Sequence, residues 1–345
     1  MPISTIPTSG LSSDQGVNFR NILINGDMSI AQRGTSVSSI SSGGAFDTVD
    51  RFSRYIASAG TWTISQSTDT PTGQGFANSV KFDCTSANSS LSAGSEFQFR
   101  TKLEGQMLQM LKKGTSSAES TTLSFWVKSN KTGTYICELF DHDNSRHINK
   151  SYTISSANTW EKKTITFAGD TTGALGNDNG NSFQVSWWLA NGTNWTSGTL
   201  QTSWGARDDT NRAVGQVNLA DSTSNEWYIT GVQLEVGTSA SDFEFVPYDV
   251  NLSRCQRYYY EYQLGFLGGY SRRAGTNIAF SALEAGTHPA PMRATPTMTA
   301  GTPTYVNASS LSFTASSHAF VARVTSTNTN YYRAFETDVE VSAEL

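Results

Sequence analysis

Charged residues are scarce in this chain of 345 residues, at 15% of the total, against roughly a quarter in typical soluble domains. The net charge is −5 and the isoelectric point is about 5.4. Basic residues are scattered rather than gathered on one segment. Because proteins that bind nucleic acid carry a basic surface, we expect no nucleic-acid partner.

Long apolar runs are also missing. No stretch approaches the roughly 20 apolar residues that a helix needs to cross a bilayer, so we predict no membrane insertion. The first 16 residues have neither a basic start nor an apolar segment. They therefore do not read as a secretory signal peptide.

Cysteine is limited to Cys84, Cys137 and Cys255. Their odd number and their spacing fit neither a disulfide framework nor a zinc site. Cys84 continues the alternation of Val80 and Phe82, which predicts a small buried side chain. This usage is compatible with folding in a reducing cytosol.

Aromatic residues, in contrast, are plentiful at 11%, with 8 Trp and 13 Tyr. That content excludes a disordered chain. Apolar residues alternate with polar ones over many short runs, as in half-buried strands. The runs cover residues 62–64, 80–84, 97–99, 123–127, 165–167 and 183–189. We therefore predict an all-β protein, a jelly-roll β-sandwich followed by a smaller C-terminal β domain.

Two local patterns modify this series of strands. Trp227 and Ile229 lie on one phase and Val232 on the other, which predicts a β-bulge at Gly231. The stretch 101–111 pairs a capping-box pattern with helical spacing of apolar residues, which predicts a short helix that ends at Gly114.

The composition divides the chain into three parts. Residues 1–20 are rich in Pro, Gly, Ser and Thr and form an extended arm, which is either a tail or a segment that orders on docking. Residues 21–250 carry the sandwich. Residues 251–345 hold short strands that bury little surface by themselves, so we predict that the protein associates as a homotrimer.

Several motifs occur in a specific order: residues 21–34, 50–52, 230–237 with 243–248, 255–259, 291–296 and 343–345. Together they resemble virion structural proteins of tailed bacteriophages, of the tail-fibre or appendage type. The resemblance implies a jelly roll akin to carbohydrate-binding modules and a C-terminal β domain. It also implies a place on the virion, assembled in the cytoplasm of the host bacterium.

From this resemblance we expect a structural subunit that contacts the host surface through a glycan or protein receptor. The arm is expected to attach it to other virion proteins. The sequence holds no nucleophile elbow, zincin motif or phosphate loop, so we predict that it is not an enzyme. Two alternatives stay open: a glycan-degrading tailspike or its accessory module, and a capsid decoration or head-fibre protein.

Candidate contact residues fall in two regions. Trp188, Trp195 and Trp204 lie among Asn, Gly, Ser and Thr, a composition suited to stacking on sugars, although the same rings can plug the sandwich or pack on another subunit. The second region, Asn328, Asn330, Tyr331 and Tyr332, is a candidate receptor contact, because loops at the end of a β domain carry recognition.

No cofactor is expected, with a structural calcium ion as the open alternative. Its candidate ligands are Asp27, Asp47 and Asp50, since calcium needs several oxygen ligands. The spacing of His142 and His147 matches no zinc motif. Acids such as Asp209 and Glu226 cannot be placed as a hydrolytic pair from sequence.

Overall fold

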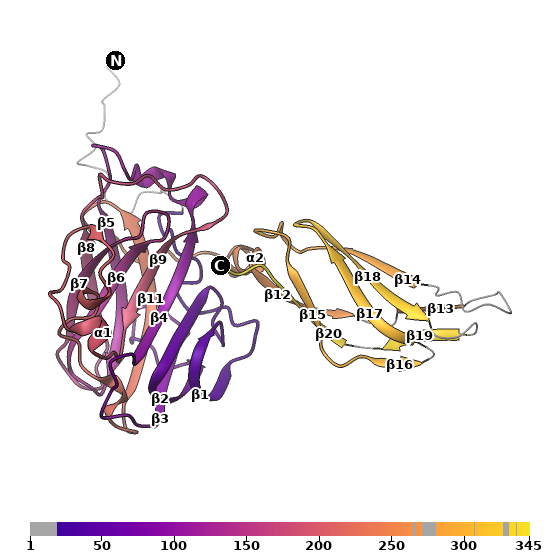
Figure 1. The fold of residues 1–345 in the computed structure, drawn as a ribbon, viewed down its shortest axis with the longest axis horizontal. Coiled ribbons are helices and arrows are strands. Elements are labelled where there is room, and N and C mark those ends of the chain that lie inside the picture. Colours follow the sequence, from indigo (N-terminus) through magenta and orange to yellow (C-terminus); the bar gives the residue numbers. More distant parts are fainter. Residues whose placement is uncertain (1–18, 265–266, 271–280, 307, 327–330, 336) are drawn as a thin grey trace, which may run out of the picture. The chain divides into compact units, whose positions relative to one another are not determined.

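The computed structural model describes residues 19–264, 267–270, 281–306, 308–326, 331–335 and 337–345. The chain splits into two compact units, Met1–Val246 and Pro247–Leu345. We call them unit 1 and unit 2. Both are built of antiparallel strands, so the protein is all-β (Figure 1).

Unit 1 contains eleven strands of one sheet and a single turn of helix, α1 (Thr193–Thr196). The strands are β1 (Ser36–Ala45), β2 (Phe52–Ser67), β3 (Ser79–Ser86), β4 (Glu96–Glu104), β5 (Thr121–Ser129), β6 (Gly133–Asp141), β7 (Arg146–Ile154), β8 (Glu161–Phe167), β9 (Asn181–Trp188), β10 (Gly205–Ala206) and β11 (Glu226–Val236).

The long strand β2 makes this sheet into a sandwich. Its first half pairs with β4 and its second half with β3. Between the halves, Ser58 and Gly60 adopt positive φ angles of 49° and 80°. The strand therefore passes from one layer, β10-β7-β6-β9-β4, to the other, β3-β11-β5-β8.

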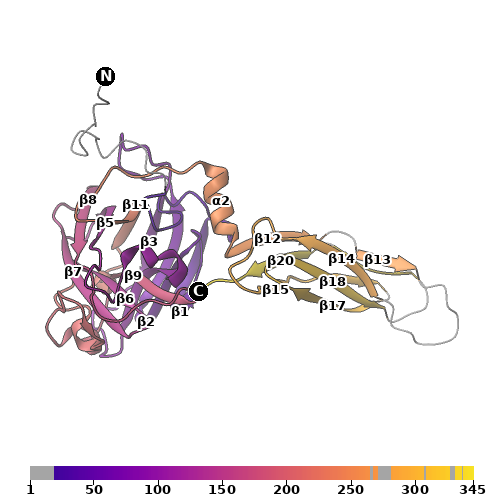
Figure 2. The same ribbon diagram turned by 90° about the horizontal axis from the view of Figure 1, so that it is seen from above.

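Aromatic rings fill the space between the two layers. Phe125 on β5 lies 5.7 Å from Trp187 on β9 and 5.2 Å from Tyr152 on β7, measured between ring centroids. Trp62, Trp187 and Trp227 are all fully buried. This is the jelly-roll-type sandwich expected from the sequence (Figure 2). Cys84 is buried in this sandwich, as its alternation with polar residues predicts.

The first and last motifs of unit 1 lie against each other. Ile22 N donates to Leu234 O, and Val232 N donates to Gly26 O. A Cβ on Gly26 would stand 2.0 Å from Val232 O, so only glycine permits this approach. The motif that begins at residue 21 thus acts as a staple on β11.

The two local predictions have opposite outcomes. The bulge at Gly231 is confirmed: the register of β11 against β5 shifts between Thr230 and Gln233, and Gly231 has a φ of 61°. The helix over 101–111 is wrong. Residues up to Glu104 belong to β4, and two 3₁₀ turns follow, Gly105–Met107 and Gln109–Leu111.

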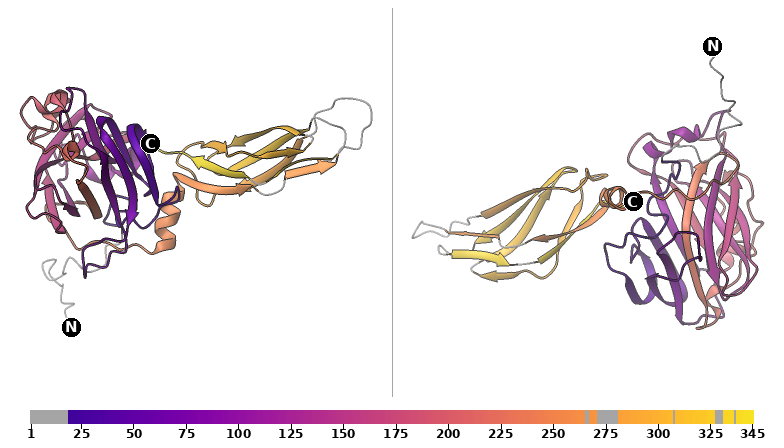
Figure 3. Two further views of the ribbon diagram at one scale, coloured as in Figure 1. Left: turned by 90° about the horizontal axis from the view of Figure 1, so that it is seen from below. Right: turned by 180° about the vertical axis from the view of Figure 1, so that it is seen from behind.

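Unit 2 begins with helix α2 (Tyr248–Gln256) and continues as three small sheets, visible in orange to yellow in Figure 3. Tyr262 and Phe320 face each other from two of these sheets at 5.1 Å. The strands are β12 (Tyr259–Leu264), β13 (Leu267–Tyr270), β14 (Ser281–Thr287), β15 (Thr297–Ala300), β16 (Thr304–Val306), β17 (Ala308–Ala315), β18 (Ala319–Ser326), β19 (Tyr331–Phe335) and β20 (Thr337–Ser342).

Among the residues that the structure describes, no helix is both long enough and apolar enough to cross a membrane.

Candidate functional site

The tryptophan-rich stretch around Trp188, Trp195 and Trp204 packs against the protein itself and does not form an open aromatic surface. Trp188 follows the core residue Trp187 and so takes the outward phase of β9, but its exposure is 0%. The chain between β9 and β11 folds back over the outer face of β6 and β9 and covers it. Trp195 then packs against Trp188 with centroids 5.4 Å apart. Trp188 is therefore not the open stacking surface that its phase predicts.

Trp204 is likewise held by the protein itself. Its Nε1 donates to Ala168 O at 2.7 Å, and its ring lies 5.9 Å from Phe183. The ammonium of Lys113 stands 5.3 Å from the ring centre. These contacts give Trp204 a structural position at the end of the sandwich.

Arg212 anchors the covering segment to the sheet. Its Nε and Nη2 donate to the two carboxylate oxygens of Glu138 at 2.7 and 2.8 Å, and its guanidinium lies 4.9 Å from the Trp188 ring centre. Burial opposes ionisation of Glu138, but Arg212 and His147 together lower its pKa to about 2. The charge pair is thus maintained inside the protein.

Two cross-strand rows continue from this pair over β6, β9, β4 and β2. In the first row Glu138 stands opposite Ser186, and Ser186 opposite Arg100. In the second, Trp188 stands opposite Gln98, and Gln98 opposite Tyr55. We call the outward side chains of these two rows the polar face: Tyr55, Gln98, Arg100, Glu138, Ser186 and Trp188.

The polar face is open at its β2–β4 side. Tyr55, Glu96 and Arg100 are half-buried, and the Arg100 guanidinium lies 5.3 Å from the Tyr55 ring centre. Partial burial raises the pKa of Glu96 and lowers that of Arg100. Charged groups with shifted pKa values often cluster at functional sites.

Buried polar atoms without a partner occur in several parts of unit 1, and three of them lie on this face. In the described part of the chain, Gln98 Oε1, Arg100 Nε and Trp188 Nε1 have no hydrogen-bond partner. Such atoms are uncommon in folded proteins and indicate a missing water or ligand. Three of them in adjacent positions of one face point to a ligand that offers both donors and acceptors.

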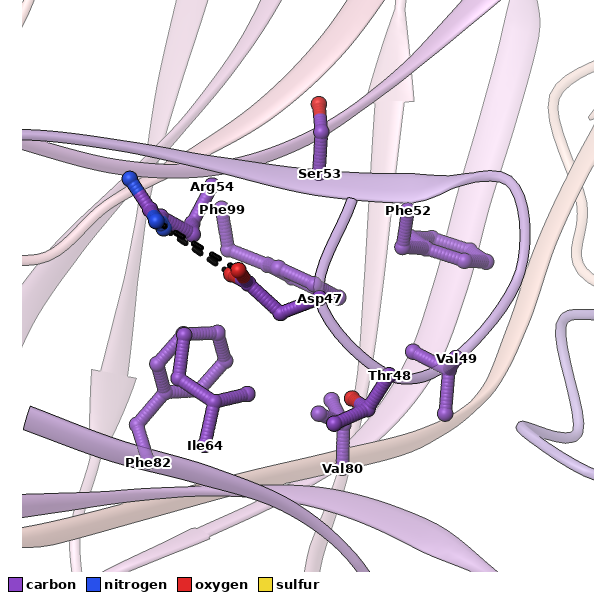
Figure 4. Close-up of a pocket in the computed structure, with 10 residues that line it drawn as sticks. All are labelled: Asp47, Thr48, Val49, Phe52, Ser53, Arg54, Ile64, Val80, Phe82 and Phe99. Atoms are coloured by element: carbon purple, nitrogen blue, oxygen red, sulfur yellow. Dashed lines mark hydrogen bonds and ion pairs between the residues drawn. The ribbon is translucent and has the colours of Figure 1, made fainter. Parts of the chain in front are cut away.

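Asp47, one of the calcium candidates, lines a small pocket (Figure 4). The pocket has a volume of about 10 Å³, room for one water at most. The Asp47 carboxylate accepts a hydrogen bond from Arg54 Nε at 2.9 Å. The Arg54 guanidinium is therefore already paired with the carboxylate that was the candidate calcium ligand.

The three calcium candidates do not converge. Asp50 is buried, forms an ion pair with Arg33 at 3.6 Å and accepts from the Gln32 backbone, whereas Asp27 accepts from Ser29 Oγ. Within the described ranges, no three His, Cys, Asp or Glu side chains form a group that could hold a metal ion.

The receptor candidates are placed only in part. Tyr331 and Tyr332 begin strand β19. Asn328 and Asn330 lie outside the described residues.

Sequence reasoning missed the polar face, although a signal for it was present. Glu96, Gln98 and Arg100 alternate with the core residues Phe97 and Phe99. Three consecutive outward positions of this strand carry large hydrogen-bonding side chains. The pairing of Glu138 with Arg212 spans 74 positions and leaves no local signature.

No known protein-family profile matches the sequence, and no curated protein matches it. Solved structures do resemble part of this chain. The tailspike protein 4 of bacteriophage CBA120 is similar over 63% of this chain, with a TM-score of 0.34 and 12% identity. The match covers only 21% of the tailspike chain.

Two carbohydrate-binding modules are also similar. A CBM4 structure matches with a TM-score of 0.30 and 11% identity, over 61% of this chain and 97% of its own. The family 11 module of a Clostridium thermocellum cellulosomal cellulase matches with a TM-score of 0.29 and 13% identity, over 59% and 99%. Likenesses at this level identify neither a ligand nor an activity.

Proposed function

We propose that the protein is a non-enzymatic structural subunit of a tailed phage particle, a fibre or appendage protein whose unit 1 binds a glycan of the host surface. The observation that carries glycan binding is the set of unpartnered polar atoms on the polar face. Sugar hydroxyls donate and accept at once, so a sugar at the open β2–β4 side can serve Gln98 Oε1 and Arg100 Nε together.

The phage assignment is supported by the order of the sequence motifs. The described contacts give those motifs a structural role, since residues 21–34 staple β11 and close the sandwich. In the proposal, the arm attaches the subunit to other virion proteins, and unit 2 mediates trimerisation and receptor contact.

The alternative of a glycan-degrading enzyme has one pair of carboxylates in its favour. Glu226 stands opposite Asp83 on β3. Burial raises the pKa of Asp83, and although burial also opposes ionisation of Glu226, hydrogen bonds from Lys81 and Tyr228 lower the pKa of Glu226. However, Lys81 Nζ binds Glu226 at 2.6 Å, which holds the pair in a salt-bridged surface cluster.

The test measures binding and turnover together. Purified host lipopolysaccharide and capsular polysaccharide are titrated into the protein, and reducing ends are assayed. We expect binding without release of reducing ends, and weaker binding in Gln98→Ala and Arg100→Ala. Arg207→Ala, at an exposed arginine of unit 1 outside the polar face, is the matched control. Release of sugar that Asp83→Asn abolishes favours the enzyme instead.

The place on the particle is tested separately. Antibody labelling of purified virions in cryo-electron microscopy distinguishes the tail from the capsid. Labelled capsids and unlabelled tails favour the decoration protein.

A further inference from the structure

A second cavity opens on the opposite layer of unit 1, away from the polar face. Its volume is about 250 Å³. On β5, Ser124 and Trp126 line it, on the phase opposite to the core residues Leu123 and Phe125. We call it the Trp126 pocket. Its volume lies just below the roughly 300–1,000 Å³ typical of small-molecule sites.

The bulge at Gly231 forms its floor. A Cβ on Gly231 would lie 2.6 Å from Phe76 Cζ and 3.1 Å from Trp126 Cδ1. Any larger residue would therefore fill the space between the two rings or push them apart. The absence of a side chain at the bulge leaves the hollow that Trp126 borders.

Three phenyl rings form the wall facing the floor. Phe76 lies 5.0 Å from Phe243 and 5.1 Å from Phe245, and the last two lie 4.9 Å apart. Phe245 stays 51% exposed, so the cluster is a rim and not a closed core. With Trp126 half-buried, aromatic surface meets the ligand from two directions.

Polar groups complete the lining. Lys162 stands opposite Trp126 in the pairing of β8 with β5, and Gln74 and Asp242 also line the cavity. Within the described chain, neither the Lys162 ammonium nor the Asp242 carboxylate has a hydrogen bond or ion pair. Both residues are exposed, so their charged groups are available to a polar ligand.

We propose that the Trp126 pocket binds one or two pyranose rings of a saccharide, independently of the polar face. The apolar C–H face of the sugar stacks on the indole of Trp126. Its hydroxyls donate to Asp242 and accept from Lys162 and Gln74. This combination of an aromatic surface with a few convergent polar groups fits a ligand that has both characters.

The experiment uses the full chain and small probes that fit this volume. Methyl glycosides of glucose, galactose, mannose and N-acetylglucosamine are tested one by one by saturation-transfer NMR and tryptophan fluorescence. We expect at least one to bind with millimolar affinity. Trp126→Ala should weaken binding about tenfold or more, and Trp126→Phe, which keeps a ring, should weaken it less.

Trp160→Ala is the matched control, because Trp160 is half-buried beside the same layer, outside the pocket, with its Nε1 bound to Asp69 at 3.0 Å. It should bind the glycoside like wild type, as should Arg100→Ala on the polar face. Unchanged melting of Trp126→Phe separates lost contact from lost folding.

Three results overturn the proposal. They are no binding of any glycoside up to about 50 mM, wild-type affinity in both Trp126 variants, or loss of binding in Arg100→Ala with normal binding in Trp126→Ala. The last result places small sugars on the polar face. Polysaccharide binding on the polar face is compatible with the first two results. The proposals for the two sites are therefore tested separately.

Discussion

Unit 1 and unit 2 both consist of antiparallel strands, yet different side chains fill their interiors. In unit 1, stacked and tilted rings span the two layers, with Trp62, Trp187 and Trp227 fully buried. The core cluster described in unit 2 contains no tryptophan. Its members are Tyr260, Leu264, Met292, Ala322, Val324, Val339, Val341 and Ala343.

The difference bears on whether each unit is stable without a partner. An aromatic side chain buries a large area when it packs, so unit 1 gains most of its stability from contacts within itself. A small domain buries a smaller share of its surface, gains less, and commonly depends on a partner surface. We therefore expect unit 1 to unfold as a self-sufficient body and unit 2 to depend on association.

The largest change should come from breaking the buried pair of unit 1. Arg212→Leu removes the charged partner of Glu138, which is 0% exposed. We expect a loss of about 3–5 kcal/mol in unfolding free energy. Chemical denaturation measures it. Arg207→Leu, which breaks the exposed pair with Asp209, should cost less than about 1 kcal/mol. Equal losses would contradict the role of burial.

Acid should weaken the same pair. The pKa of Glu138 falls from its usual 4.5 to about 2 in the folded state. The folded carboxylate holds its proton less tightly than the unfolded one, so its stabilisation is present above pH 4.5 and is lost between pH 4.5 and about 2. Calorimetry over this range should show unit 1 melting progressively earlier. Glu138→Gln should flatten that dependence, and an unaltered slope would argue against it.

Association should act on unit 2 alone. If unit 2 trimerises, its calorimetric midpoint should rise by roughly a few degrees over a hundredfold increase in protein concentration. The midpoint of unit 1 should stay constant. Truncation after residue 250 should leave a monomer in sedimentation. A trimer that persists in the truncated chain would reverse the comparison.

The arm should have the smallest effect on folding. Deletion of residues 2–16 removes few apolar groups, so the midpoint of unit 1 should move by less than about 1 °C. Incorporation into particles, followed by mass spectrometry of purified virions, should be lost. A large fall in midpoint would show that the arm belongs to the fold.

The strand predictions succeeded because a period of two is a local property. Val80, Phe82 and Cys84 reach the core wherever β3 pairs, and the phase change at Gly231 is visible within a few residues. The helix predicted after Thr101 failed because β4 pairs on both sides, with β2 and β9. Hydrogen bonds to two neighbours outweigh a capping pattern.

The candidate sites depended on contacts that the sequence does not display. Trp188 is covered only because the segment that carries Arg212 returns to β6. The Trp126 pocket needs the bulge at Gly231 and the residues around Phe243 to meet. The outward phase of Trp126 on β5 was readable, but the groups that surround it come from four separate segments.

The segment that closes the Trp126 pocket is also the chain that leaves unit 1 for unit 2. Any tension pulling on unit 2 therefore enters unit 1 at Val246 and first loads Phe245 and Phe243. These rings and the bond from Glu244 N to Gln233 Oε1 can peel away one at a time. Strand β11 behind them is paired along both β3 and β5, so many backbone hydrogen bonds hold it in place. Under mechanical load, the pocket wall would yield before the sandwich does.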